Sequence, residues 1–570
     1  MAPIARFESE KVDASSLGEP LKYEFSGRTA PNRFMKGAMT ERLSSWDPKN
    51  LEARGIPSKE LINAYRRWGE GEIGNILTGN VMIEYDHLEA SGNPIVPRGA
   101  PYEGERFEAF KEMAEVAKKH GSLMVAQVSH PGRQVQDLIQ PNPVSASAIQ
   151  LSGNVMGMTF AKPRAAAEED IANIIEGFAH AAEYLEKAGY DGVELHGAHG
   201  YLLAQFLSPT TNQRTDKYGG SLENRARLVF EIAQEIRKRT SPSFILGIKL
   251  NSVEFQDKGL TPEDAKQMCV LLEQNSFDFV ELSGGTYESL AFEHKKESTK
   301  KREAFFMDFA DLIAPELHKT KVYVTGGFQT VAAMVDARKT VDGIGLARAL
   351  CHEPQFCKDI LAGKVTGTVK PAMDLADIGP TIVIAGTQIR QIGKDHQPID
   401  MTRPENVQGF FKDLDPHITE NMDKKSRARA YIANKLSDEH KDLTAKLKSY
   451  ESEDAIATHY TLRLKDNHAL SPPPQELALS QNLIADPLGL RFPKNKRHFS
   501  EDSPELIVRE YVAAAYDARH PTWDWDGLWC PVVKEWWEGD SVYPTRIFPV
   551  MPGPGVMQYL ISIAIVTDLA

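Results

Sequence analysis

The sequence predicts a (β/α)₈ barrel, in which eight parallel strands close into a ring covered by helices, followed by a C-terminal extension that we expect to be mostly helical. Two observations carry this prediction. Over roughly the first four hundred of the 570 residues, short apolar strand patterns alternate with helical patterns, and the strand patterns number eight. Polar and titratable side chains also follow several strands directly, as they do where the strand ends of a barrel form a ligand site.

Each strand pattern is a short apolar run bounded by turn residues. In chain order the expected strands are Arg33–Met39, Asn75–Ile83, Leu123–Ser129, the segment that begins at Tyr190, Phe244–Leu250, Phe277–Leu282, Lys321–Val324 and Gly343–Leu346. Helical patterns lie between them. The clearest has apolar residues at helical spacing at Ile171, Ile174, Ile175, Phe178, Ala182 and Leu185. A doubly wound open sheet is the alternative fold, but no G-x-G-x-x-G motif follows any strand, so a nucleotide site of that fold is not supported.

Composition excludes several classes of protein. The formal net charge of -13 argues against a nucleic-acid surface, because phosphate contacts need clustered Lys and Arg. The four cysteines, Cys269, Cys351, Cys357 and Cys530, lack metal-ligand or disulfide-framework spacing, which is consistent with a reducing compartment. The N-terminus lacks the apolar segment of a signal peptide, and no apolar run approaches the ~20 residues of a membrane span. We therefore expect a cytoplasmic protein with no membrane or nucleic-acid partner.

The most informative stretch runs from Tyr190 to Arg227, where His196, His199 and Tyr201 follow one strand end within a few residues. Histidine supplies hydrogen-bond donors and tyrosine can hand over a proton, so the three side chains suit binding a carbonyl oxygen and protonating a neighbouring carbon. The alternative is a structural or metal-binding role for the histidines. An H-x-x-H pair with no third ligand in view is a poor zinc site, so no metal is predicted.

The last two strands end in features typical of a phosphate site. Barrels often bind phosphate at the loops after strands seven and eight. Here Gly326 and Gly327 follow the seventh strand and let the backbone approach a ligand closely, and Ala347 and Arg348 follow the eighth. A Gly pair by itself is more often an ordinary turn. Together with an Arg that can fork onto phosphate oxygens, the two loops predict an anion site.

Other strand ends direct polar groups toward the same mouth. The first strand ends in Ala38, Met39 and Thr40, the third carries Gln127, and the fifth carries Lys249 between apolar neighbours. A single strand Gln or Lys is usually a satisfied structural residue. Combined with a phosphate site, a hydroxyl, an amide and a cation predict a binding site for a planar heterocycle that can become anionic.

At six places in order, the sequence resembles the Old Yellow Enzyme family of FMN-dependent NAD(P)H oxidoreductases, over about residues 20–410. The matching segments are Asn32–Leu43, Ala126–Gln134, Asp191–Arg227, Ile248–Leu260, Val322–Thr330 and Gly343–Leu350. The resemblance implies a TIM barrel that binds FMN and takes hydride from NADPH or NADH. It implies flavin contacts from Ala38, Met39, Thr40, Gln127, Lys249, Gly326, Gly327, Ala347 and Arg348.

The resemblance also implies a reaction. His196 and His199 would hydrogen-bond the carbonyl oxygen of an unsaturated substrate, and Tyr201 would protonate the α-carbon while flavin N5 delivers hydride to the β-carbon. Because no separate dinucleotide domain is visible, NAD(P)H would enter the same pocket and leave before the acceptor binds. The family more often has Arg at the position of Lys249, and Lys keeps the charge without the fork.

We divide the chain into an FMN-binding barrel at 1–415, a charged helical segment or linker at 416–470, and a region of unknown fold at 471–570. The last region places Trp523, Trp525, Trp529, Trp536 and Trp537 within fifteen residues and ends in an apolar run. It is either a further domain cut short or the product of a gene model joined to, or truncated within, a neighbouring reading frame.

Three functional classes remain open from the sequence. The first is an ene-reductase of α,β-unsaturated carbonyls. The second is an NAD(P)H oxidase or a quinone and xenobiotic reductase in which Tyr201 is dispensable. The third is a non-redox binding protein. Self-association into a homo-oligomer is left open.

Overall fold

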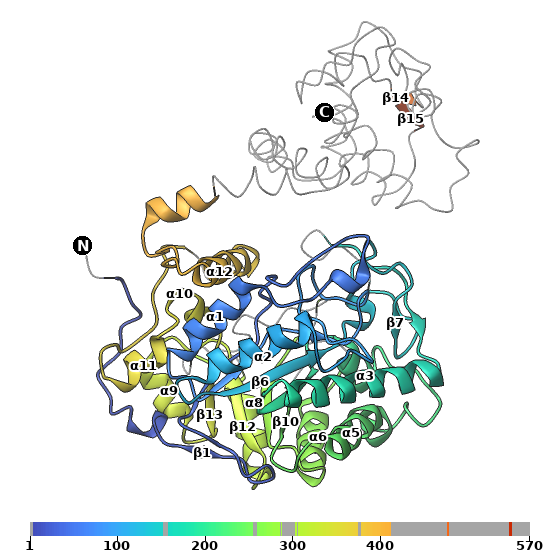
Figure 1. Cartoon of the computed structure of the whole chain (residues 1–570), viewed down its shortest axis with the longest axis horizontal. Helices are drawn as coiled ribbons and strands as arrows, with labels where there is room; N and C mark the ends of the chain where they lie inside the picture. Colours follow the sequence, from blue (N-terminus) through green and yellow to red (C-terminus); the bar gives the residue numbers. More distant parts are fainter. Residues whose placement is uncertain are drawn as a thin grey trace, which may run out of the picture. The chain divides into compact units, whose positions relative to one another are not determined.

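The structure is a computed structural model that describes residues 4–151, 158–252, 254, 259–285, 287, 303–304, 306–373 and 378–411, together with two short strands further on. The chain divides into two compact units, Met1–Val407 and Gln408–Ala570. The first unit holds the barrel (Figure 1). In the second, β14 (Glu476–Leu477) pairs antiparallel with β15 (Ile547–Pro549). The charged segment and the Trp-rich region expected after residue 415 otherwise lie outside the described residues.

The first unit is a closed barrel of eight parallel strands, which confirms the predicted (β/α)₈ fold. The eight strands are β3 (Phe34–Lys36), β4 (Asn75–Leu77), β6 (Leu123–Ser129), β9 (Gly192–Gly197), β10 (Ile245–Asn251), β11 (Phe279–Ser283), β12 (Lys321–Thr325) and β13 (Gly343–Leu346). The sheet closes because β3 pairs with β4 on one side and with β13 on the other. Closure brings all eight carboxyl ends to one mouth.

One predicted strand was wrong in extent. The segment Asn75–Ile83 is not a single strand: β4 ends at Leu77, and a separate short strand, β5 (Val81–Met82), pairs with the end of β6. Between them, the backbone N–H of Gly79 donates to the Glu41 carboxylate at 2.8 Å instead of to a neighbouring strand. Because of this break, the backbone leaves the sheet after Leu77, and Asn80 lies at the mouth of the barrel.

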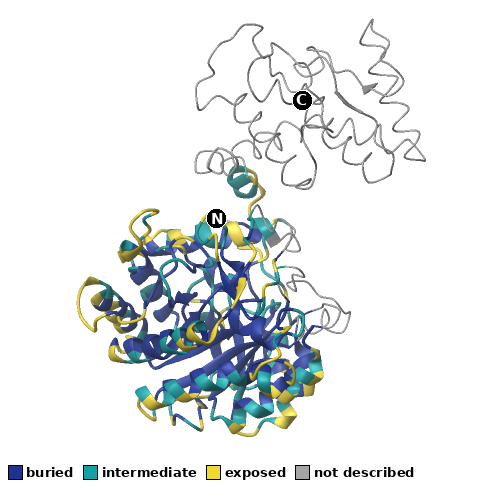
Figure 2. Cartoon of the chain, turned by 90° about the vertical axis from the view of Figure 1, so that its right-hand side faces the viewer, coloured by how far each residue is buried: buried dark blue, intermediate teal, exposed yellow. Residues whose placement is uncertain are grey.

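Helices cover the outside of the barrel, and their apolar faces pack against it (Figures 1 and 2). They are α1 (Lys59–Gly69), α2 (Glu105–Lys118), α3 (Glu168–Lys187), α5 (Leu222–Arg239), α6 (Pro262–Gln274), α8 (Met307–Ile313), α9 (Val331–Ala337), α10 (Arg348–His352), α11 (Phe356–Leu361) and α12 (Ile378–Gly393). Local sequence explains several starts. The hydroxyl of Ser58 accepts from the N–H of Leu61 at 3.2 Å, and Thr261 with Asp264 forms a capping box ahead of α6. Among the described residues, no helix is both long and apolar enough to cross a bilayer.

The barrel interior has an apolar base. The hairpin of β1 (Leu21–Lys22) and β2 (Thr29–Ala30) contributes to this base, and the hydroxyl of Tyr23 lies 2.8 Å from that of Tyr323. The base is a separate cluster of buried residues: Leu21, Tyr23, Ala30, Met35, Leu77, Leu123, Val125, Ile245, Phe279 and Tyr323. Side chains alternate along a strand, so inward-facing residues of β6, β9, β10 and β11 that lie nearer the carboxyl ends form a second layer closer to the mouth. That second layer is polar.

Dense packing of the base predicts the effect of one methyl group. A Cβ added to Gly192 would overlap the Cβ and the carbonyl oxygen of Ile245. We expect Gly192→Ala to destabilise the barrel by about 1–3 kcal/mol, since an overpacked core must shift backbone. Gly386 on α12 is the control, because a Cβ there meets no atom within 4 Å. Chemical denaturation of both variants measures the difference, and equal stabilities would contradict the packing described here.

Candidate active site at the carboxyl ends of the strands

The loops after β3, β12 and β13 lie side by side on one part of the mouth. The N–H of Gly37 donates to the carbonyl of Leu346 at 2.8 Å, and a Cβ at Gly37 would approach Thr325 and Ala347. Gly326 and Gly327 have φ values of 110° and 91°, which favour glycine. The structure therefore brings the predicted glycine pair next to Ala347.

Arg348 begins α10 beside these loops and is held by a helix that the sequence analysis did not link to the site. Its Nη1 donates to the hydroxyl of Thr381, in the first turn of α12, at 2.9 Å. Burial lowers the pKa of this guanidinium, which nevertheless stays charged at neutral pH. This part of the mouth thus combines a glycine pair in the left-handed region with one largely enclosed cation.

The residues after β3 are half-buried on the adjoining wall. Ala38 packs against the apolar base, and Met39 Sδ lies 3.3 Å from Cys351 Sγ. The hydroxyl of Thr40 donates to Glu89 Oε2 at 3.0 Å. Glu89 was not predicted as a site residue, and its carboxylate connects this wall to the histidines.

The two histidines hydrogen-bond to each other and are held at both ends by polar side chains. His196 Nδ1 lies 2.7 Å from Asn80 Oδ1, and His196 Nε2 lies 3.1 Å from His199 Nδ1. His199 Nε2 lies 2.8 Å from Ser283 Oγ at the end of β11. Burial lowers the pKa of both imidazoles, that of His199 to about 3, so both rings are neutral at pH 7.

These contacts define a direction for the hydrogen bonds. An amide oxygen only accepts, so His196 Nδ1 carries the proton that faces Asn80. Accordingly His196 Nε2 accepts from the Nδ1–H of His199, and His199 Nε2 accepts from the Ser283 hydroxyl. Glu89 supports this direction, since its Oε2 lies 3.5 Å from Asn80 Nδ2 and so keeps the amide nitrogen away from the histidine.

Tyr201 lies over the first histidine. The ring centroids of Tyr201 and His196 are 4.6 Å apart, and the Tyr201 hydroxyl lies 3.0 Å from that of Tyr287. Burial raises the pKa of Tyr201 well above its ordinary value, and the neighbouring Tyr287 adds to the effect. The phenol therefore keeps its proton at neutral pH and can donate it.

A polar layer crosses the barrel directly below the mouth. The amide Nε2 of Gln127 donates to Glu194 Oε1 at 2.7 Å, and Lys249 Nζ donates to Glu281 Oε1 at 2.7 Å. All four side chains are at least 95% buried. The sequence analysis singled out Gln127 and Lys249 but missed the two carboxylates, although an acidic residue inside an apolar strand was a readable signal.

These groups fit FMN. A flavin needs polar groups at its pyrimidine edge and a cation with backbone donors at its phosphate. Gln127 and Lys249 would provide the first set, and Arg348 with its neighbouring loops would provide the second. Asn251 Nδ2, at the end of β10, is buried and has no hydrogen-bond partner among the described residues, so a ligand oxygen would satisfy it.

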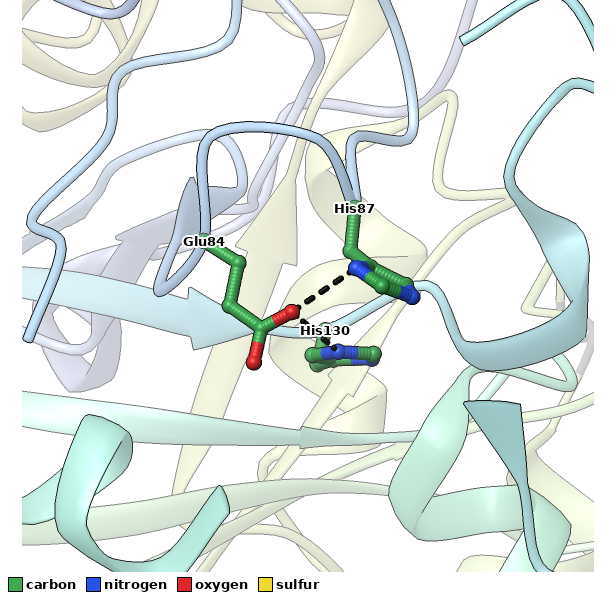
Figure 3. A group of neighbouring side chains, drawn as sticks. All are labelled: Glu84, His87 and His130. Atoms are coloured by element: carbon green, nitrogen blue, oxygen red, sulfur yellow. Dashed lines mark ion pairs between the residues drawn. The ribbon is translucent and has the colours of Figure 1, made fainter. Parts of the chain in front are cut away.

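A separate cluster of Glu84, His87 and His130 lies after β5 and β6 (Figure 3). Glu84 Oε2 lies 2.7 Å from His87 Nδ1 and 3.5 Å from His130 Nε2, and Asp86 Oδ1 lies 3.0 Å from His87 Nδ1. His130 Nδ1 accepts from the N–H of Gly132 at 3.0 Å, so its neutral ring carries the proton on Nε2. That proton faces the position a metal would need, so we interpret the cluster as an ion pair.

The fold and the mouth together define a class, a (β/α)₈ oxidoreductase with a flavin-type site at its strand ends. Residues 16–366 match the model of the NADH:flavin oxidoreductase / NADH oxidase family. The chain is 54% identical over 400 residues to the NADH-dependent flavin oxidoreductase nadA of Aspergillus parasiticus, covering 70% of this chain and 90% of that protein. It is 39% identical over 172 residues to 12-oxophytodienoate reductase 1 of Oryza sativa, covering 30% and 44%.

Solved structures have the same fold. Morphinone reductase superimposes with a TM-score of 0.51 at 21% sequence identity, covering 64% of this chain and 95% of that one. The family model and the 54% identical relative show that the chain belongs to the NADH:flavin oxidoreductase / NADH oxidase family, to which the Old Yellow Enzymes also belong. The predicted family is confirmed.

The ion pair at His87 predicts a pH dependence of stability. Burial opposes charge on His87, but hydrogen bonds to Asp86 and Glu84 outweigh it and raise the pKa of His87 from 6.5 to about 9. Stabilisation from a raised pKa is complete below the unfolded value and is lost as pH rises through the folded value, here between about 6.5 and 9. The loss amounts to about 3 kcal/mol.

Thermal unfolding across this pH range tests the prediction. The difference in melting temperature between wild type and His87→Gln should shrink as pH rises. His120→Gln, at an exposed position, should have the melting temperature of wild type at every pH. A constant difference between wild type and His87→Gln would show that His87 does not titrate in the folded state.

Proposed function

We propose that this protein is an FMN-dependent ene-reductase that reduces the C=C bond of α,β-unsaturated carbonyl compounds with NADH or NADPH. The observation that supports this most directly is the arrangement of His196, His199 and Tyr201, in which two neutral imidazoles lie beside a phenol that keeps its proton. Bound FMN would supply the redox chemistry, accepting hydride from the nicotinamide and passing it to the β-carbon of the substrate.

The protein would hold the cofactor from two sides. Gln127 and Lys249 would contact the pyrimidine edge, and the residues after β3, including Thr40, would line the opposite edge. The phosphate would be held by Gly326, Gly327, Ala347 and Arg348. Supporting this assignment, the groups come from strand ends that surround one mouth, and the cation and backbone donors lie apart from the amide and lysine.

His199 would donate a hydrogen bond to the carbonyl oxygen of the substrate, and His196, whose N–H faces Asn80, would orient His199. In the structure His199 donates its Nδ1–H to His196 Nε2 at 3.1 Å. A carbonyl oxygen entering beside the rings competes for this N–H, because it is the better acceptor when the substrate gains electrons. Withdrawal of charge toward that oxygen makes the attached alkene more electrophilic at its β-carbon.

Tyr201 would then deliver the proton. The reaction adds one hydride and one proton across the double bond, and Tyr201 can supply the proton to the α-carbon as a general acid. The hydroxyl of Tyr287, 3.0 Å away, can return a proton to Tyr201 after each turnover. The names of the fungal relative and of the family favour NADH as the hydride donor, and the name of the rice relative denotes an oxo-dienoate as its substrate.

Replacing Tyr201 tests the assignment. Tyr201→Phe should slow reduction of 2-cyclohexenone by about 10²- to 10⁴-fold, the usual contribution of general-acid catalysis, while FMN binding and reduction by NADH stay near wild type. Tyr190→Phe is the matched control, because the Tyr190 hydroxyl is also buried but has no hydrogen-bond partner among the described residues. Anaerobic stopped-flow absorbance separates the two half-reactions.

The same experiment separates the second candidate function. The family description includes NADH oxidases, which need no proton donor for an alkene. Full enone turnover in Tyr201→Phe would favour an oxidase or quinone reductase.

The phosphate site predicts a loss of affinity. We expect Arg348→Lys to weaken FMN binding by about tenfold or more, since Lys lacks the two-pronged contact and a charge-assisted hydrogen bond contributes roughly 1.5–3 kcal/mol. Quenching of FMN fluorescence by the apoprotein gives the Kd. Arg227→Lys, on the outer helix α5, should bind FMN like wild type. Unchanged affinity in Arg348→Lys would place the phosphate elsewhere.

A further inference from the structure

The polar layer of the barrel consists of four side chains, one from each of four neighbouring strands. Gln127 on β6 donates to Glu194 on β9, and Lys249 on β10 donates to Glu281 on β11, each at 2.7 Å. Glu194 and Glu281 lie on the two strands that flank β10, and the ionisation of each affects the pKa of the other. The second oxygen of each carboxyl, Oε2, is buried and accepts no hydrogen bond from the described residues by distance and angle.

The charge of Lys249 is paired with that of Glu281. Burial opposes ionisation of Glu281, but the adjacent Lys249 outweighs it and holds the pKa of that carboxyl below its ordinary value. Burial and the charge of Glu281 raise the pKa of Glu194 well above its ordinary value. Burial thus favours the protonated form of Glu194 over its carboxylate, whereas Lys249 and Glu281 form an ion pair.

A purely structural role explains this pair poorly. Removing two charges from water costs about as much as their attraction returns, so apolar residues of similar size would fill the barrel at least as well. The layer also adjoins the histidines, since Lys249 pairs in register with His196 on one side and with Glu281 on the other. A ligand bound beside the histidines is therefore also close to the Lys249–Glu281 pair.

We propose that Glu281 is a positioning residue that orients Lys249 and neutralises it, and so lowers the reduction potential of the flavin. The inference rests on the proposed function, because it needs FMN to contact Lys249. A single uncompensated cation would stabilise the negative charge that reduction places on the flavin. With Glu281 ionised beside it, Lys249 can donate a hydrogen bond to the flavin while contributing little net charge, and reduced flavin stays a stronger hydride donor.

Other charged and titratable groups face this pair from the surrounding strands. Glu194 on β9 and Thr325 on β12 are neighbours of Glu281. The charge of Glu281 also acts to raise the pKa of His199 and that of Lys36 on β3. His199 is neutral near pH 7. Burial lowers the pKa of Lys36 to about 8, so this lysine also titrates near the working range. Glu281 remains the group in direct contact with Lys249.

The test measures the reduction potential of the FMN-loaded protein by equilibration with redox dyes. Glu281→Gln should raise the potential, with at least a tenfold change in the equilibrium constant, which is about 30 mV for a two-electron couple. Lys249→Met should lower it. Glu281→Asp, which keeps the charge, should stay within threefold of wild type. Glu176→Gln is the control, because Glu176 pairs with Arg239 on the outer helices at 2.8 Å.

Each outcome decides between the inference and the proposed function. If wild type binds FMN and NADH bleaches it, but Glu281→Gln leaves the potential unchanged, the role of Glu281 is wrong and the proposed function stands. If Lys249→Met also has no effect, Lys249 does not contact the flavin. A chain that binds no FMN overturns both proposals.

A double variant covers the case in which Glu281→Gln does not fold. Lys249→Met/Glu281→Leu removes the ion pair without leaving an unpaired charge, so its potential should stay within threefold of wild type in the equilibrium constant. A potential as low as that of Lys249→Met would mean that Lys249 acts through its own uncompensated charge, and would overturn the inference.

Discussion

The pairing of β3 with both β4 and β13 is the constraint on which the rest of this structure depends, because it closes the sheet. A closed parallel barrel has no free edge, and all of its carboxyl ends open at one mouth. Residues as distant in sequence as Thr40 and Arg348 consequently share one site. Without closure, the glycine loops after β12 and the polar residues after β3 would lie at opposite edges of an open sheet.

The interior of the barrel explains why chemistry is confined to that mouth. Its base is apolar and tightly packed, whereas the layer above it holds Gln127, Glu194, Lys249 and Glu281. Buried charges persist only with partners, and each member of this layer has one. The layer thus forms a polar floor beneath the position proposed for the flavin, in which the charge of Lys249 is paired with that of Glu281. In such a floor, Lys249 could orient the flavin through a hydrogen bond while Glu281 offsets the positive charge of the lysine.

A second network, above the floor, determines the protonation of the histidines. It runs from Thr40 through Glu89 and Asn80 to the two imidazoles and ends at Ser283. The histidines and Tyr201 were predictable, since titratable residues directly behind a strand stand out in the sequence. Asn80, Glu89 and Ser283 were not, because each lies in an unremarkable local pattern and acquires its role only from a partner on another strand. The acidic residues at Glu194 and Glu281 fall between these cases, since their alternation with apolar neighbours marked them as inward-facing.

The sequence by itself determined the alternation of strands and helices, the number of barrel strands and the identity of the residues at the strand ends, because hydrophobic periodicity and turn residues are local properties of the chain. The tertiary structure decided which of those residues are partners. It broke the expected second strand after Leu77, directed Asn80 to His196, and paired Lys249 with Glu281. Hydrogen bonds and ion pairs depend on distances of about 3 Å between atoms, and only the closed barrel brings residues from separate strands that close.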